Sequence, residues 1–360
     1  MTEGDNIAHV KDGMAIFNPV LKHIYRDFDG RVTALGSTTM QRGHKILIGT
    51  SHGKVYIHNA TEAYTVDDNY EYIVYEDGEK RTISALGGLA LATLVYIHIR
   101  TYGVVIMKES SEDMINDLEG RLLPYTTILS DHHGFCNVIS HGFRIVIPSS
   151  DKHLIVWSND STESTIDLVN TGAPMVLALF HNEPVVGAED GSVAIYKYLK
   201  PGDHIREQIF NSPIFSLTSI DDRLVVGSVA SQIKILNSKL RVLANINYPS
   251  SAMGCGALAA GDPYSKELKR FAAGFWDGSI RIYSTSSYGI RYVINPINES
   301  KHSTNSLVWI VNLLQDQLFA ACEDGNLYLY EIETKRSLRS IKRDQQKNEK
   351  TKNKSHDDDL

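Results

Sequence analysis

The chain has 360 residues, of which 42 % are hydrophobic and 22 % charged, and its net charge is −7. This composition is that of an ordinary globular protein and excludes a collagen-like, low-complexity or wholly disordered chain. Residues 335–360 carry nine Lys or Arg and five acids, which leaves a charge of −11 on the rest of the chain. So acidic a body argues against direct nucleic-acid binding, except weakly through the basic tail.

Signals for export, membrane insertion and metal binding are missing from the sequence. The first residues are acidic and lack the apolar core of a secretory signal, and the best apolar run, Leu89–Ile99, is too short to span a membrane. The cysteines Cys136, Cys255 and Cys322 are widely spaced in apolar surroundings, which indicates buried thiols rather than a zinc site or a disulfide framework. We therefore expect an intracellular protein without a metal or cofactor.

A pattern repeats along the chain at intervals of 39 to 50 residues. Each repeat has an apolar segment and then a β-hairpin of alternating apolar residues around a tight turn. The apolar segments are Val32–Ser37, Ile83–Gly88, Phe135–Ser140, Met175–Phe180, Ile214–Ser219, Gly254–Ala259 and Leu307–Leu314. The hairpins are Ile46–Asn59, Leu94–Lys108, Arg144–Ser158, Val185–Tyr198, Leu224–Ser238, Phe271–Ser284 and Leu318–Glu331. Between repeats lie candidates for a fourth strand, such as Tyr70–Asp77, His204–Phe210, Leu240–Ile246 and Ile290–Ile294.

The spacing is typical of propeller blades with four antiparallel strands. It predicts an all-β fold, a single seven-bladed β-propeller, rather than the two domains that the length suggests. We expect an N-terminal lead-in over residues 1–19, the propeller over 20–342 and a disordered charged tail over 343–360. Leu21–Phe28 and Ser337–Lys342 compete as the strand that completes the last blade, and the sequence does not decide between them.

Blade three contains His132, Ser149 and Asp151, residue types that could activate a nucleophile in an enzyme. Asp151 stands six residues before Trp157, His132 lies in the loop before the inner strand and Ser149 is on the second strand. This arrangement resembles the WD40 repeat, in which His, Ser, Asp and Trp form a hydrogen-bonded tetrad within a blade. The resemblance implies a structural tetrad and a WD40-type propeller, since such a tetrad satisfies polar groups that the blade buries. It implies no catalytic residue.

Three other blades keep part of this pattern. Asp190, Asp277 and Asp324, which we call the blade-turn aspartates, each stand six residues before a tyrosine and have no obvious upstream histidine. We therefore expect incomplete tetrads there. Trp276, beside Asp277, is either a packing residue or an exposed anchor for a partner. His52 and His58 in blade one have no acidic or cysteine partners in the sequence, which indicates a surface and a strand histidine rather than ligands.

Several stretches together carry a narrower resemblance. They are Val20–Leu35, the step Gly134-Phe135-Cys136, Pro148 before two serines, Ala173–Phe180 followed by Glu189–Tyr196, and Gly274–Tyr283. In combination they resemble the ASTRA-associated protein 1 family, called guanine-nucleotide-binding protein subunit beta-like protein 1 in animals. The resemblance implies a chromatin-linked scaffold without enzymatic activity. It implies a location in the nucleus and is compatible with a second location in the cytoplasm.

The partners that this resemblance implies are the telomere-length-regulation co-chaperone, the RuvB-like ATPases and a PIKK-family pseudokinase, in a complex that matures such kinases. One alternative is a substrate receptor of a cullin ubiquitin ligase or another WD40 adaptor, although the Asp-x-Arg that marks such receptors after the third strand is missing here. A propeller hydrolase is a second alternative, but the inner strands contain almost none of the acids or histidines that its chemistry requires.

Overall fold

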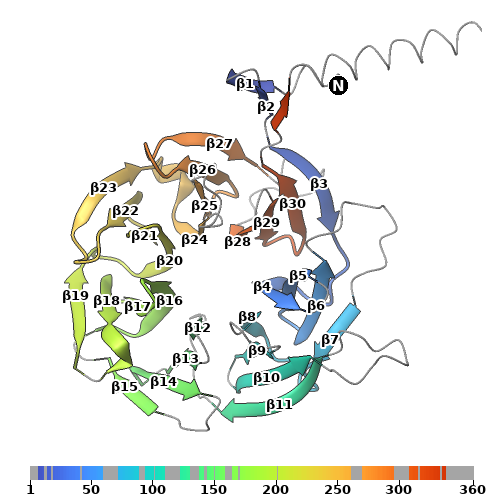
Figure 1. The fold of residues 1–360 in the computed structure, drawn as a ribbon, viewed down its shortest axis with the longest axis vertical. Coiled ribbons are helices and arrows are strands. Elements are labelled where there is room, and N and C mark those ends of the chain that lie inside the picture. Colours follow the sequence, from blue (N-terminus) through green and yellow to red (C-terminus); the bar gives the residue numbers. More distant parts are fainter. Residues whose placement is uncertain are drawn as a thin grey trace, which may run out of the picture.

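The computed structural model describes residues 7–11, 14–17, 19–40, 43–59, 72–88, 94–100, 102–109, 122–129, 138–141, 144–149, 151–158, 164–168, 171–200, 202–260, 270–295, 308–314, 317–332 and 335–337. Within them, seven four-stranded antiparallel sheets form a ring, with the first strand of each sheet near the centre and the fourth at the rim (Figure 1). The prediction of an all-β, seven-bladed propeller is confirmed. None of the described helices is long and apolar enough to cross a membrane.

The strands are given blade by blade, from the centre outwards. Blades one to three contain β4 (Val32–Met40), β5 (Gly43–Thr50), β6 (Lys54–Asn59) and β7 (Tyr72–Glu76); β8 (Ile83–Gly88), β9 (Leu94–Ile99), β10 (Gly103–Glu109) and β11 (Leu122–Leu129); and β12 (Ile139–His141), β13 (Arg144–Pro148), β14 (His153–Ser158) and β15 (Ser164–Asp167). Blades four and five contain β16 (Pro174–Phe180), β17 (Glu183–Ala188), β18 (Ser192–Tyr196) and β19 (His204–Gln208); and β20 (Ile214–Ile220), β21 (Arg223–Ser228), β22 (Gln232–Leu236) and β23 (Val242–Asn247). Blades six and seven contain β24 (Cys255–Ala260), β25 (Arg270–Phe275), β26 (Ile280–Ser284) and β27 (Ile290–Ile294); and β28 (Val308–Leu314), β29 (Gln317–Cys322), β30 (Leu327–Glu331) and β3 (Val20–Tyr25). The described residues also include the short 3-10 helices η2 (Lys197–Leu199) and η3 (Ser250–Ala252).

The core lies between the blades. Seven clusters of buried apolar side chains occur among the described residues, one for each pair of neighbouring blades. The middle strands contribute to two clusters at once: in β5, Ile46 and Ile48 pack against blade seven, whereas Leu47 packs towards blade two. Because both faces of these strands are buried, their sequences are nearly continuous apolar runs.

The N-terminal candidate closes the ring. β3 pairs antiparallel with β30, with Ile24 opposite Tyr328, and Lys22 forms an ion pair with Glu331 at the same seam. The competing segment begins in β31 (Lys335–Ser337), which pairs instead with β2 of a small three-stranded sheet outside the ring (Figure 1). Closure therefore joins the first propeller strand to the last hairpin and covers an edge that would otherwise be exposed.

The small outer sheet falls partly within the expected lead-in. It consists of β1 (Ile7–Lys11), β2 (Met14–Phe17) and β31, so residues before the propeller form a hairpin of their own. β31 lies within the range expected for the propeller but belongs to no blade. The charged tail expected over residues 343–360 lies outside the described residues.

The inner strands share a feature that the sequence did not predict. In six of them the pairing with the second strand slips by one residue immediately after the first pair. The additional residues are Thr33, Ser84, Met175, Phe215, Gly256 and Trp309. Bulges of this kind bend a strand and increase its twist, which suits strands that converge on a central axis.

Candidate functional site

The described site residues gather at one end of the propeller. We call this end the turn face, because it carries the turns between the second and third strands of the blades. The loops that lead from each outer strand into the next blade reach the same end, since the strands alternate in direction. The blade-turn aspartates, Asp151, Trp276 and His52 all lie in these turns.

The blade-turn aspartates hold their own turns together. In blade four, Asp190 Oδ1 accepts hydrogen bonds from the backbone N (2.9 Å) and hydroxyl (2.6 Å) of Ser192. Asp277 accepts the same pair from Ser279, at 2.9 and 2.6 Å. Asp324 accepts from the backbone N of Asn326 (3.0 Å) and the hydroxyl of Tyr328 (2.6 Å). These carboxylates therefore satisfy turn N–H groups, which is the usual role of Asp in a tight turn.

Asp190 also links its turn to two other parts of the blade. Its Oδ2 accepts from the backbone N of Gly172, in the loop before β16, and from Arg206 on β19, both at 3.0 Å. Partial burial alone would raise the pKa of Asp190, but the hydrogen bonds from Ser192 and Arg206 hold it below its usual value. A backbone N–H thus makes the connection that a tetrad histidine would make.

In blade three the structure brings together two members of the predicted tetrad. Ser149 is buried, and its hydroxyl hydrogen-bonds to the exposed carboxylate of Asp151. Trp157 is buried in the cluster between blades two and three. His132 lies outside the described residues, so its place in the tetrad stays a prediction.

A histidine that the sequence analysis did not single out lies beside Asp151. His153 Nδ1 is 2.9 Å from Asp151 Oδ1, and its Nε2 is 2.9 Å from Asp167 Oδ1 at the end of β15. The hydrogen bond to Asp151, helped by the second carboxylate, raises the pKa of His153. Hydrogen bonds from Ser149 and His153 lower the pKa of Asp151. Both ring nitrogens of this histidine are engaged.

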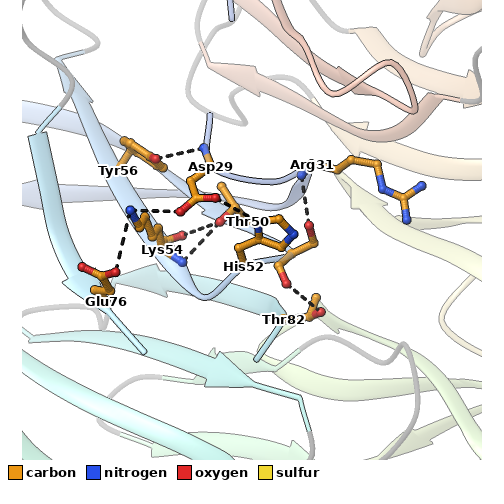
Figure 2. A network of polar contacts seen from close by, with 9 residues as sticks. Asp29, Arg31, Thr50, His52, Lys54, Tyr56, Glu76 and Thr82 are labelled. Atoms are coloured by element: carbon orange, nitrogen blue, oxygen red, sulfur yellow. Dashed lines mark hydrogen bonds and ion pairs between the residues drawn. The ribbon is translucent and has the colours of Figure 1, made fainter. Parts of the chain in front are cut away.

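His52 is exposed at the surface, as predicted, but it has an acidic partner that the sequence did not indicate (Figure 2). Asp29, in the loop before β4, places Oδ1 2.8 Å from His52 Nδ1 and Oδ2 3.0 Å from Lys54 Nζ. The hydrogen bonds from His52 and Lys54 lower the pKa of Asp29 to about 2. Compared with the predicted tetrad the positions are exchanged, because the acid is in the loop and the histidine in the turn.

This network connects three blades on the turn face (Figure 2). Lys54 Nζ also lies 3.7 Å from Glu76 Oε1 at the end of β7. The backbone N of Arg31 donates to Ser51 Oγ (3.0 Å), while its guanidinium lies 3.8 Å from Glu323 of blade seven. Thr82, which leads into blade two, donates to the carbonyl of Ser51 (3.2 Å). These polar contacts thus join blade one, which follows the closing strand β3 in the sequence, to blades seven and two.

Trp276 packs against the inner strands and is partly exposed. A Cβ added at Gly256, the bulge residue of β24, would lie 2.5 Å from Trp276 Nε1, and one at Gly254 would lie 3.0 Å from Cε3. Its ring also meets that of Phe215, the bulge residue of β20, edge-on at 5.2 Å. The indole therefore occupies the space that a side chain at Gly256 would take.

Other reactive groups of the described chain are poorly placed for chemistry. Cys255 and Cys322 are buried free thiols, and burial raises the pKa of Cys255 to about 12 and that of Cys322 further. Cys136 lies outside the described residues. The described residues contain no group of three or more His, Cys, Asp or Glu side chains placed to hold a metal ion.

Comparison with known proteins adds no relative. A scan against protein-family models finds no match, and a search of curated proteins finds none either. The fold itself, seven blades of four antiparallel strands, is consistent with the WD40 superfamily. Any narrower assignment therefore depends on the residues themselves.

Proposed function

We propose that this protein is a non-catalytic scaffold that binds other proteins through the surfaces of a closed propeller. One observation carries this proposal: the described polar side chains of the turn face bond to one another and to turn backbone instead of converging on a common reaction centre. A scaffold requires such a rigid body, because pre-ordered surfaces lose little entropy when a partner binds.

The chemistry of the candidate catalytic residues supports the same proposal. Asp151 and Asp167 occupy both nitrogens of His153, which leaves this imidazole no nitrogen with which to activate a nucleophile. The thiols of Cys255 and Cys322 are buried and have raised pKa values, and it is the thiolate that is nucleophilic. Each residue instead fits a role in holding a blade together.

Within this class we propose a WD-repeat subunit of an ASTRA-type assembly, located in the nucleus. The support is the combination of Val20–Leu35, Gly134-Phe135-Cys136, Pro148 and the two blade stretches described above. The first of these now has a structural role, because it contains the closing strand β3 and the loop with Asp29. The proposed partners are the telomere-length-regulation co-chaperone, the RuvB-like ATPases and a PIKK-family pseudokinase.

Affinity purification of the tagged full chain, followed by mass spectrometry, tests this assignment. The proposal predicts recovery of the co-chaperone and the RuvB-like ATPases. Cullin adaptors in their place would favour the receptor alternative and overturn the assignment. A chain with Gly191→Ala, which the close approach of Gly191 to Phe210 O should destabilise, serves as the misfolded control.

The hydrolase alternative is tested at the tetrad. His132→Ala should lower the free energy of unfolding without changing any turnover that the purified protein shows, because the proposed role is structural. A variant that keeps its stability and loses an activity would contradict the scaffold proposal.

A further inference from the structure

Exposed apolar side chains are concentrated in one sector of the ring. Six large hydrophobic residues of the described chain are exposed, and five of these belong to blades five and six or to the segment between them. The five are Val242, Leu243, Met253, Ile290 and Val293, with exposed fractions of 44–55 %. The sixth, Tyr125, lies on β11 in blade two. Exposed apolar residues that gather in one sector mark interaction surfaces more often than scattered single residues do.

Four of the five lie on two outer strands. Val242 and Leu243 are on β23 and Ile290 and Val293 on β27, each the last strand of its sheet at the rim of the ring (Figure 1). The outer strands of blades three and four are different, since the exposed residues of β15 and β19 are polar or charged. Proteins ordinarily protect edge strands with such charges, so two neighbouring apolar edges call for a function.

The same sector has the opposite charge to the rest of the disc. Residues 214–295, which span blades five and six, carry nine Lys or Arg and five acids, whereas the remainder of the chain up to residue 334 has a net charge of −15. Lys239, Arg241 and Arg291 are exposed and lie next to the apolar side chains in the sequence. The surface therefore combines aliphatic contacts with positive charge.

Hydrogen bonds hold this surface in shape. Asn237 Oδ1 accepts from the backbone N atoms of Lys239 (2.9 Å) and Arg241 (3.0 Å), which orders the turn before β23. The guanidinium of Arg223, from blade five, contacts the hydroxyl of Tyr288 in the turn before β27. β23 and β27 thus begin at the same end of the ring, each after a turn that hydrogen bonds hold in place. In the turn before β27 this bond crosses the interface between blades five and six.

We propose that this rim surface, formed by Arg241, Val242, Leu243, Ile290, Arg291 and Val293, binds an acidic protein segment that contains apolar residues. The segment binds in extended form, as an added strand on an outer edge, where main-chain hydrogen bonds give affinity and alternate side chains give specificity. The inference rests on the proposed scaffold function and names the chemistry of one partner.

The mixture of groups favours this partner over two others. Nucleic acid would use the arginines but has no aliphatic groups for Leu243 and Val293, and the acidic remainder of the disc repels polyphosphate. A second copy that met this rim with its own rim would place like charges together. An acidic segment with alternating apolar residues satisfies both the arginines and the aliphatic side chains.

Fluorescence anisotropy with labelled ten-residue peptides tests the proposal on the purified full chain. The probes are an alternating Glu-Val peptide, a Glu-Ser peptide that lacks the apolar groups, a Lys-Val peptide of opposite charge and a ten-base-pair DNA duplex. The variants are Leu243→Thr with Val293→Thr, and Arg241→Glu with Arg291→Glu. Tyr125→Thr in blade two is the matched control, and thermal unfolding establishes that each variant is folded.

We expect the Glu-Val peptide to bind the wild type at least tenfold more tightly than the other probes, and each double variant to weaken it about tenfold. The control should bind like the wild type. Equal binding of all peptides, unchanged binding by the variants, tighter binding of the duplex, or a dimer that the variants dissociate would each overturn the proposal. If the threonine pair did not fold, the arginine pair would decide the question alone.

A negative peptide-binding result can be distinguished from a result that contradicts the proposed scaffold function. If the tagged wild type recovered the co-chaperone and ATPases while the peptide result was negative, the scaffold function would stand and the rim inference would fall. If the peptide result was positive and no partner was recovered, the ASTRA-type assignment would fall instead.

Discussion

Substitution of Gly256 by alanine should destabilise the protein only while Trp276 is present. Gly256 is the bulge residue of β24, and its backbone lies outside the left-handed region, so alanine imposes no conformational strain there. Space is the difficulty, because the added Cβ would lie 2.5 Å from Nε1 and 3.1 Å from Cδ1 of Trp276. Contacts this close force the indole to move.

The indole has little freedom to do so. The ring of Phe215 meets it edge-on at a centroid distance of 5.2 Å, and the backbone of Gly254 lies against its other carbon atoms. Overpacking of this kind costs about 1–3 kcal/mol, and we expect Gly256→Ala to lower the free energy of unfolding by about 2 kcal/mol. In a Trp276→Ala background the obstruction is gone, and alanine in a strand is better than glycine by roughly 0.5–1 kcal/mol.

A double-mutant cycle measured by urea unfolding, with circular dichroism as the probe, gives the coupling between the two positions. The packing interpretation of Trp276 predicts a coupling of about 2–3 kcal/mol, the sum of the lost obstruction and the gain from alanine. Additive effects, within about 0.5 kcal/mol, would refute it and leave Trp276 as an anchor that does not pack on the inner strand.

Three further predictions concern the ring, a turn and a histidine. Deletion of residues 1–25 removes β3 and leaves β30 as an edge, so size-exclusion chromatography should show self-association that the full chain lacks; a monomeric, equally stable product would refute closure by β3. Gly191→Ala, whose Cβ would lie 2.1 Å from Phe210 O, should lower the free energy of unfolding in urea by about 2–4 kcal/mol. Gly202→Ala is the control, because Gly202 also has a positive φ but open space around it, and it should lower that free energy by about 1 kcal/mol. Equal losses for the two variants would contradict this prediction. His153 should titrate by NMR with a pKa above 6.5, and Asp151→Asn should lower this pKa. Because the pKa is raised in the folded protein, the stabilisation that the protonated His153 gives is complete below pH 6.5 and is lost as the pH rises through the folded pKa.

The repeat could be predicted from sequence because each hairpin carries its signal locally. The turns at Gly191, Gly278 and Gly325 combine an acid with a glycine between alternating apolar runs, and the structure has a positive φ at each of them. The closing strand could not be chosen in the same way. Leu21–Phe28 and Ser337–Lys342 have similar patterns, and only tertiary pairing distinguishes β3 on β30 from β31 on β2.

The site was harder to predict where its contacts are distant in the chain. Asp29 and His52 are separated by 23 residues and a strand pair, so no local pattern joins them. The spacing of His153 two residues after Asp151 is visible in the sequence, but its second partner, Asp167, lies across the sheet. The sequence allows two interpretations of Trp276 because the glycines that it covers precede it by 20 and 22 residues.

The exposed apolar rim could not be predicted for a related reason. Ile290–Ile294 has the pattern of a half-buried strand, and the sequence does not tell which alternate side chains meet a neighbouring blade. In the structure Val293 is exposed between the buried Tyr292 and Ile294, as alternation requires. Ile290 would be buried by the same alternation, but it is exposed because a register shift separates it from Tyr292. The register shift in β27 therefore decides the exposure of Ile290.

The most direct test of the scaffold function is the composition of the complex recovered with the tagged full chain. We expect the wild type to co-purify with the co-chaperone and the RuvB-like ATPases in near-constant proportion through size-exclusion chromatography. We expect His132→Ala to reduce recovery only as far as it reduces the folded fraction. A folded chain that elutes alone, or that turns over a substrate in a manner that requires His132, would contradict the scaffold function.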